Sequence, residues 1–374
     1  MQLTSPAFVG LVCLLAAAAL AGTLWALPKV GGTGPRPLGL RAALLLGCQL
    51  VITLALLTGM NAYFVFYNSW NDLLGRLGSP VGVRSAQPGK GAAANRALTT
   101  KVSPLSAGQG LRTPSRDGRL DETTIPGLRT GLRAPAFVYL PPQYFQQRYA
   151  NRRFPVVLVL AGYPGDPRGI IERQQMVKSA ARDMRAGKIQ PTIYVITRTM
   201  VAPPRDTECT DVPGGPQAET YFAQDVPAAL EATYRLTPDE HGWGVMGQSA
   251  GGYCAVKLAM LHSDRFAAGA SLGGHLHALK DATTGDLYAN NRKVREQNNL
   301  LWRLQHLPPP PTSVLLASSK VERGYQQAQR FVRLAKPPLR VDTLFPDEGG
   351  HNFGTFRRLT PEMMRWMDGQ LSAR

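Results

Sequence analysis

One short stretch, residues 241–252, constrains the fold of this chain more than any other. It reads HGWGVMGQSAGG, which is a short apolar run, the pattern G-x-S-x-G centred on Ser249, and then a helix-forming segment. Glycines two residues before and two residues after a serine let the backbone turn sharply and hold that serine in a strained conformation. We therefore predict a strand, a tight turn that exposes the Ser249 hydroxyl, and a helix whose amino end faces it. The same pattern also occurs in strand-to-helix turns without chemistry, so Ser249 needs partners.

Apolar runs of strand length alternate with helical patterns through the rest of the chain from about residue 118. Expected strands lie at 136–142, 155–161, 192–197, 266–272, 313–317 and 339–345, and expected helices at 168–185, 219–234, 324–334 and 361–371. Near-continuous apolar runs are typical of parallel strands that helices cover on both faces. With the turn at Ser249, this alternation predicts an α/β-hydrolase fold, a mostly parallel sheet with helices on both faces.

A serine hydroxyl becomes a good nucleophile when a base takes its proton and a third group orients that base. In this fold the acid and then the histidine follow the serine along the chain. His351 lies between the expected last strand and last helix, so we predict it as the base. Glu322 follows the strand at 313–317, so we predict it as the acid. Asp342 and Asp347 are alternatives, but the first lies within a strand and the second shares the loop of His351.

Two backbone N–H groups should stabilise the oxyanion that forms when Ser249 attacks a carbonyl. One is that of Ala250, directly after the serine, and the other comes from the loop GYPGD at 162–166. We choose Tyr163 first and Gly162 second, since Pro164 has no N–H. Four cysteines form no C-x-x-C pair, so the sequence gives no support to a zinc or thioredoxin-type site. A serine triad needs neither a metal nor a dissociable cofactor, so none is expected.

Two charge-free apolar runs, at about 8–27 and 42–66, precede this domain. Each is long enough to cross a bilayer as a helix, so we predict two transmembrane helices within residues 1–78. A cleaved signal peptide is the alternative for the first run, and a buried helical hairpin is the alternative for both. Lys29, Arg36 and Arg41 lie in the connection, which the positive-inside rule places in the cytoplasm. We therefore expect a multi-pass cell-membrane protein whose catalytic domain lies on the extracellular side.

The segment 79–112 is rich in Gly, Ala, Pro and Ser and has little apolar pattern, so we predict a flexible linker ahead of a catalytic domain at 113–374. The formal net charge of +17 suits anionic surroundings such as phospholipid or cell-wall polymer. Its basic residues are scattered and match no zinc-finger or RNA-binding pattern, so no nucleic-acid partner is expected.

Three motifs in this domain carry a resemblance to a known family. They are VYLPPQY at 138–144, GQSAGG at 247–252, and GGHNF at 349–353 ahead of a helix that contains a tryptophan. From about residue 113 to its end the chain resembles the esterase D family of α/β hydrolases, in the branch of the antigen 85 mycolyltransferases. The resemblance implies a serine triad whose acid is often Glu, and hydrolysis of esters or acyl transfer. With its two spans the chain is similar to membrane-anchored actinobacterial members, but Ala161 stands where many members carry an acidic or polar residue.

We therefore expect an outward-facing serine esterase or acyltransferase that acts on a small-molecule or lipid ester through an acyl-enzyme. The alternative is a catalytically silent α/β-hydrolase domain that binds envelope components or a partner protein. The sequence leaves three points open. Cys209 and Cys254 either pair or remain free thiols, the segment 273–311 either moves as a lid or does not, and the oligomeric state is undetermined.

Overall fold

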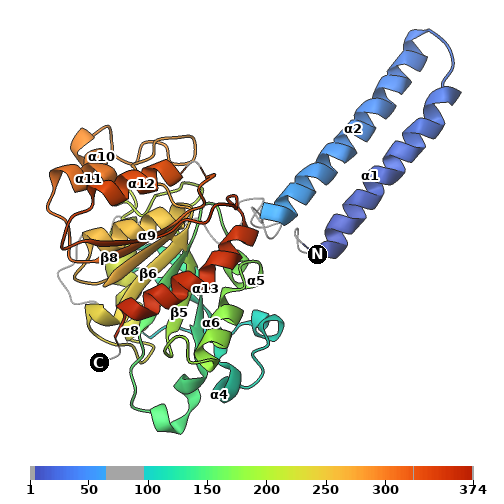
Figure 1. Cartoon of the computed structure of the whole chain (residues 1–374). Coiled ribbons are helices and arrows are strands. Elements are labelled where there is room, and N and C mark those ends of the chain that lie inside the picture. Colours follow the sequence, from blue (N-terminus) through green and yellow to red (C-terminus); the bar gives the residue numbers. More distant parts are fainter. Residues whose placement is uncertain (1–4, 65–96, 323, 373–374) are drawn as a thin grey trace. The chain divides into compact units, whose positions relative to one another are not determined.

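The structure is a computed structural model that describes residues 5–64, 97–322 and 324–372. The chain divides into two compact units, Met1–Gly82 and Val83–Arg374. The first unit contains two apolar helices, and the second contains a single sheet with helices on both faces (Figure 1).

The first unit consists of helices α1 (Pro6–Ala26) and α2 (Pro35–Phe64), which pack against each other. Both are long and apolar enough to cross a membrane, and their leucines are largely exposed, Leu14 by 71% and Leu46 by 70%. Helix α2 begins seven residues before the expected position 42, because Pro35 suits the first turn of a helix. The expected end of this span, at 66, lies outside the described residues.

The second unit is built on a nine-stranded sheet in the order β1-β2-β3-β5-β4-β6-β7-β8-β9. Strands β4 to β9 are parallel to one another, whereas β1, β2 and β3 are antiparallel to their neighbours. The strands are β1 (Thr100–Val102), β2 (Arg119–Pro126), β3 (Arg133–Leu140), β4 (Val156–Ala161), β5 (Ile193–Arg198), β6 (Trp243–Gln248), β7 (Ala268–Leu272), β8 (Ser313–Ala317) and β9 (Arg340–Leu344). The predicted α/β-hydrolase fold is thus confirmed, with an antiparallel extension at one edge.

Two helical layers cover this sheet (Figure 1). One layer contains α8 (Val226–Glu231), α9 (Ala250–Leu261), α11 (Leu300–His306) and α12 (Tyr325–Leu334), and the other contains α5 (Pro167–Glu172), α6 (Met176–Arg185) and α13 (Phe353–Gln370). Side chains of β4 alternate between the layers: Leu158 and Leu160 join the first core, and Val157 and Val159 join the second. A strand covered on both faces reads as one apolar run, which explains why β4 was evident from the sequence.

The expected helix at 168–185 is two helices, α5 and α6, because Gln175 adopts a left-handed conformation with φ of 54° between them. Helix α13 begins at Phe353 rather than 361, because the Asn352 side chain accepts a hydrogen bond from the N–H of Thr355 and caps it. The expected linker at 79–112 ends earlier, since residues 97–112 are folded and β1 pairs with β2.

The remaining described α-helices of the second unit, α4, α7 and α10, are short. Helix α4 (Pro114–Asp117) precedes β2, and α7 (Ala218–Thr220) leads through one π-helical turn into α8. Between β7 and β8 the chain forms α10 (Arg292–Gln297) and α11 within the segment 273–311. Arg205 binds the backbone carbonyls of Thr284 and Asp286, so this segment is held to the loop after β5.

Candidate active site

Ser249 occupies a sharp turn between β6 and α9. Its backbone has φ of 54° and ψ of −126°, which is unusual for a residue with a side chain and costs about 1–3 kcal/mol. Gln248 and Ala250 are buried, whereas Ser249 is partly exposed. A Cβ on Gly251 would lie 2.1 Å from the carbonyl oxygen of Leu160, so only glycine allows the turn to press against β4. The predicted strained and accessible serine is therefore present.

The loop after β4 passes directly beside this turn. A Cβ on Gly162 would lie 2.8 Å from the Cβ of Ser249 and 2.9 Å from the carbonyl oxygen of Gln248. The next residue is Tyr163, whose hydroxyl donates a hydrogen bond to the carbonyl oxygen of Pro204 at 3.2 Å. Ala250 is the first residue of α9, where N–H groups have no acceptor within the helix. Ala250 thus follows Ser249 directly along the chain, and the second predicted donor, Tyr163, follows Gly162, which lies against Ser249.

Gly273 connects the serine to the other two predicted residues. The N–H of Ser249 donates to the carbonyl oxygen of Leu272 at 3.0 Å, and Gly273 follows Leu272 at the end of β7. A Cβ on Gly273 would lie 3.0 Å from Nδ1 of His351 and 3.3 Å from Oε2 of Glu322. The structure therefore brings residues 249, 322 and 351 to the same edge of the sheet, around the carboxyl end of β7.

His351 and Glu322 face each other. Nδ1 of His351 lies 3.5 Å from Oε1 of Glu322, and the side chain of Glu322 is 9% exposed whereas that of His351 is 48% exposed. Burial raises the pKa of Glu322, but its contacts with His351 and Ser318 outweigh burial and hold this pKa below its ordinary value. A carboxylate that stays ionised beside an imidazole can orient the ring and stabilise its protonated form.

The alternative acids have other partners. Asp347 pairs with Lys320, with 2.6 Å between Oδ1 and Nζ, and Asp342 accepts a hydrogen bond from the indole N–H of Trp366 at 2.7 Å. Of these three carboxylates, Glu322 is the one that lies next to the His351 imidazole.

The loops that carry Glu322 and His351 are joined by hydrogen bonds. The hydroxyl of Ser319 donates to the carbonyl oxygen of Gly349, and the N–H of Lys320 donates to that of Pro346 at 2.9 Å. These bonds and the Lys320–Asp347 pair reduce the freedom of two loops that would otherwise have to be ordered during the reaction.

A buried segment at 206–210 borders the nucleophile helix. Cys209 forms a disulfide with Cys254 of α9, which decides between the two alternatives that the sequence left open. Glu208 and Cys209 both have positive φ, and the carboxylate of Glu208 lies 2.8 Å from Nε2 of His275. His275 in turn stacks on Tyr253 of α9 with 4.5 Å between ring centroids. The segment thus connects α9 to the loop that follows β7.

A buried lysine on α9 binds this segment. The Nζ of Lys257, on α9, donates to the carbonyl oxygen of Cys209 at 2.8 Å and to the hydroxyl of Thr210 at 2.9 Å. It also lies 3.5 Å from Oε2 of Glu219, and the Lys257 side chain is fully buried. Burial raises the pKa of Glu219, but Lys257 and His262 outweigh it and lower this pKa. The sequence analysis missed this network, although a single lysine in the apolar run GGYCAVKLAM was its signal.

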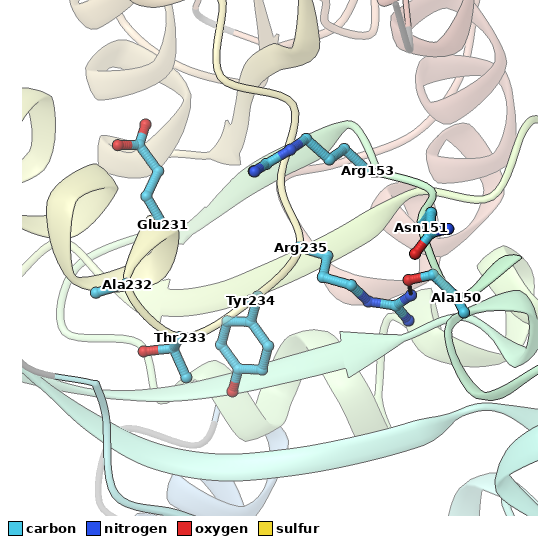
Figure 2. Close-up of a pocket in the computed structure, with 8 residues that line it drawn as sticks. All are labelled: Ala150, Asn151, Arg153, Glu231, Ala232, Thr233, Tyr234 and Arg235. Atoms are coloured by element: carbon cyan, nitrogen blue, oxygen red, sulfur yellow. Dashed lines mark hydrogen bonds between the residues drawn. The ribbon is translucent and has the colours of Figure 1, made fainter.

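A surface pocket of about 430 Å³ lies elsewhere (Figure 2). It is lined by Ala150, Asn151, Arg153, Glu231, Ala232, Thr233, Tyr234 and Arg235. It adjoins the start of β4, where the N–H of Phe154 donates to the carbonyl oxygen of Arg235, and so lies at the sheet edge opposite Ser249. The Arg235 guanidinium is already bound to backbone carbonyls and stacked on Tyr144, so it is structural. In the described part of the chain, no group of three or more His, Cys, Asp or Glu side chains could hold a metal ion.

Comparison with known proteins agrees with this fold. The Esterase family model matches residues 129–331, which is more than half of the chain. The chain belongs to the Esterase family. The matched region contains the turn at Ser249 and the loop of Glu322.

Proteins with sequence similarity to the chain include the MPT51/MPB51 antigen of Mycobacterium tuberculosis, 34% identical over 76 residues. This alignment spans 20% of the chain and 25% of the antigen. An uncharacterised protein of Corynebacterium glutamicum is 25% identical over 136 residues, which are 35% of the chain and 30% of that protein. The chain therefore matches less than a third of the length of these relatives.

Solved structures show the shared fold at low identity. An S-formylglutathione hydrolase from Agrobacterium tumefaciens has a TM-score of 0.57 at 14% identity, covering 74% of this chain and all of that one. The MPT51 structure from Mycobacterium tuberculosis has a TM-score of 0.50 at 16% identity, covering 67% of this chain and 97% of that one. Both support the α/β-hydrolase fold.

Proposed function

We propose that the protein is a membrane-anchored serine esterase or acyltransferase in which Ser249, His351 and Glu322 form the catalytic triad. One observation carries this proposal: His351 and Glu322 lie next to each other and both lie against Gly273. Gly273 follows Leu272, whose carbonyl oxygen accepts a hydrogen bond from the N–H of Ser249. The imidazole of His351 removes the Ser249 proton while the hydroxyl oxygen attacks the ester carbonyl. Glu322 keeps Nδ1 of the ring oriented and stabilises the imidazolium.

The reaction then proceeds through two tetrahedral intermediates. The N–H groups of Tyr163 and Ala250 donate to the oxyanion of the first one, and His351 returns its proton to the departing alcohol as the C–O bond breaks. The acyl group remains on Ser249. Water or an alcohol then attacks the acyl carbonyl while His351 takes its proton, and His351 returns that proton to the Ser249 oxygen as the acyl–oxygen bond breaks and the free acid or new ester leaves. Hydrolysis and acyl transfer share the same steps and differ only in the second nucleophile, which is water in one and an alcohol in the other. Both therefore belong to this proposal.

Replacement of Ser249 by Ala tests the assignment. We expect the turnover of p-nitrophenyl butyrate to fall at least about a thousandfold, because the variant lacks the hydroxyl that would form the acyl-enzyme. Circular dichroism controls for folding. Turnover that stays within a factor of two of the wild type would refute the role of Ser249.

We further propose that α1 and α2 span the membrane and that the catalytic domain lies outside the cell. Lys29 lies in the connection between the two helices, and Arg36 and Arg41 lie in the first two turns of α2, close to that connection. Basic residues favour the cytoplasmic side. The Cys209–Cys254 disulfide suits an oxidising compartment. An epitope tag after Arg374 should bind antibody on intact cells without permeabilisation. Binding only after permeabilisation would show that the catalytic domain lies inside the cell, which contradicts the proposed orientation.

A further inference from the structure

Ser318 is the first residue after β8, and its side chain contacts the predicted acid, Glu322. Its N–H donates to the carbonyl oxygen of Leu344 in β9 at 3.2 Å, and the residue is 5% exposed. Its hydroxyl lies 2.8 Å from Oε2 of Glu322 and 3.4 Å from the carbonyl oxygen of Ser319. The shorter contact has the geometry of a charge-assisted hydrogen bond, so the hydroxyl donates to the carboxylate.

The two carboxylate oxygens of Glu322 make different contacts. Oε2 is held by Ser318, whereas Oε1 is buried, has no hydrogen bond within the described residues, and lies 3.5 Å from Nδ1 of His351. The terminal torsion of a Glu side chain is broad, so the carboxylate plane is not fixed by its own rotamer. A donor at one oxygen selects the plane and directs the other oxygen toward the imidazole.

Resting on the proposed triad, we propose that Ser318 is a positioning residue that fixes the carboxylate of Glu322 for its contact with His351. Ser318 acts through Glu322 and does not touch the substrate. Its N–H binds β9, and the residue before it, Ala317, pairs with both β7 and β9. The Ser318 hydroxyl therefore has a fixed position from which it can orient a carboxylate that comes from a turn. The bond also stabilises the ionised form of the carboxylate, which is the form that the imidazolium needs.

The proposal is tested by a double-mutant cycle on the full chain with p-nitrophenyl butyrate. Ser318→Ala should lower kcat by roughly tenfold with little change in KM, because orientation of the base matters in the transition state. Glu322→Ala should lower kcat by at least about a hundredfold. In the Glu322→Ala background, Ser318→Ala should then lower kcat by less than about twofold, because Ser318 has no carboxylate left to position.

A matched control removes another buried hydroxyl from the same strand. Ser313 begins β8 at the opposite end, and Ser313→Ala should leave kcat unchanged. Thermal unfolding of each variant verifies that it is folded. Equal effects of Ser318→Ala in both backgrounds, or no effect in the wild type, would overturn the positioning role while leaving the triad intact. Full activity of Glu322→Ala would instead refute the proposed acid, and with it the basis of this inference.

Discussion

The backbone of Gly162 lies against Ser249 so closely that a methyl group on Gly162 would sit 2.8 Å from the Cβ of the serine. Such a contact forces either the turn or the loop after β4 to move. We therefore expect Gly162→Ala to lower kcat/KM for p-nitrophenyl butyrate by at least about a hundredfold, since oxyanion donors work only at the correct distance. Gly369→Ala is the control, because a Cβ there meets nothing within 4 Å. Equal activity of both variants would contradict this geometry.

Lys257 should matter for stability through the oxygens that it binds. Lys257→Met leaves the carbonyl of Cys209 and the carboxylate of Glu219 without the buried ammonium. We expect this substitution to lower the free energy of unfolding by about 3–5 kcal/mol, as for a broken buried ion pair. Urea denaturation measures the change. Lys178→Met, at an exposed position of α6, should have little effect, and similar losses from both substitutions would argue against the network.

Counting the free thiols tests the Cys209–Cys254 disulfide directly. In denaturant without reductant, iodoacetamide should label two cysteines, Cys13 and Cys48, and after reduction it should label all four. Intact mass gives the number of labels. Cys209→Ser with Cys254→Ser should lower the free energy of unfolding by about 2–4 kcal/mol, because the cross-link restricts the unfolded chain. Four labels without reductant would show that the thiols are free.

Asp206 should make stability depend on pH. Burial, together with the negative charge of Glu208, raises the pKa of Asp206 from 3.8 to about 7. Because the folded protein holds this proton more tightly than the unfolded chain, the stabilisation is complete below about pH 4 and is lost as the pH rises to about 7. At about 1.4 kcal/mol for each pKa unit, the loss amounts to a few kcal/mol.

Asp206→Asn is the matched variant for this effect. An amide cannot ionise, but it retains an oxygen that can accept the hydrogen bond from the N–H of Glu208. The free energy of unfolding, measured with urea between pH 4.5 and 7.5, should fall less steeply for Asp206→Asn than for the wild type. Parallel pH profiles would assign the dependence to other groups.

The sequence predicted those parts of the molecule that local patterns determine. Strand β4 was evident because both of its faces are buried, and the turn at Ser249 was evident because Gly251 has no room for a side chain. The positions of Glu322 and His351 followed from chain order, and the structure places both at the predicted edge. Their catalytic roles stay predictions.

Other features depend on contacts between distant segments, which no local pattern reveals. Lys257 is buried because Glu219 and the backbone of Cys209 meet it from two other segments. The strand β1 lies in a Gly- and Ser-rich stretch and forms because β2 offers a free edge. Helix α13 begins before Pro361 because Asn352 caps it, and a proline does not interrupt a helix that is supported by packing on both sides of it.

The central claim is that Ser249 carries the acyl group, and rapid quenching during turnover of p-nitrophenyl butyrate tests it most directly. Intact mass of the quenched wild type should show one added butyryl group, and peptide mapping should place it on the peptide that contains Ser249. Ser249→Ala should show no such adduct. A butyryl group on another residue, or an adduct that persists in Ser249→Ala, would contradict the account.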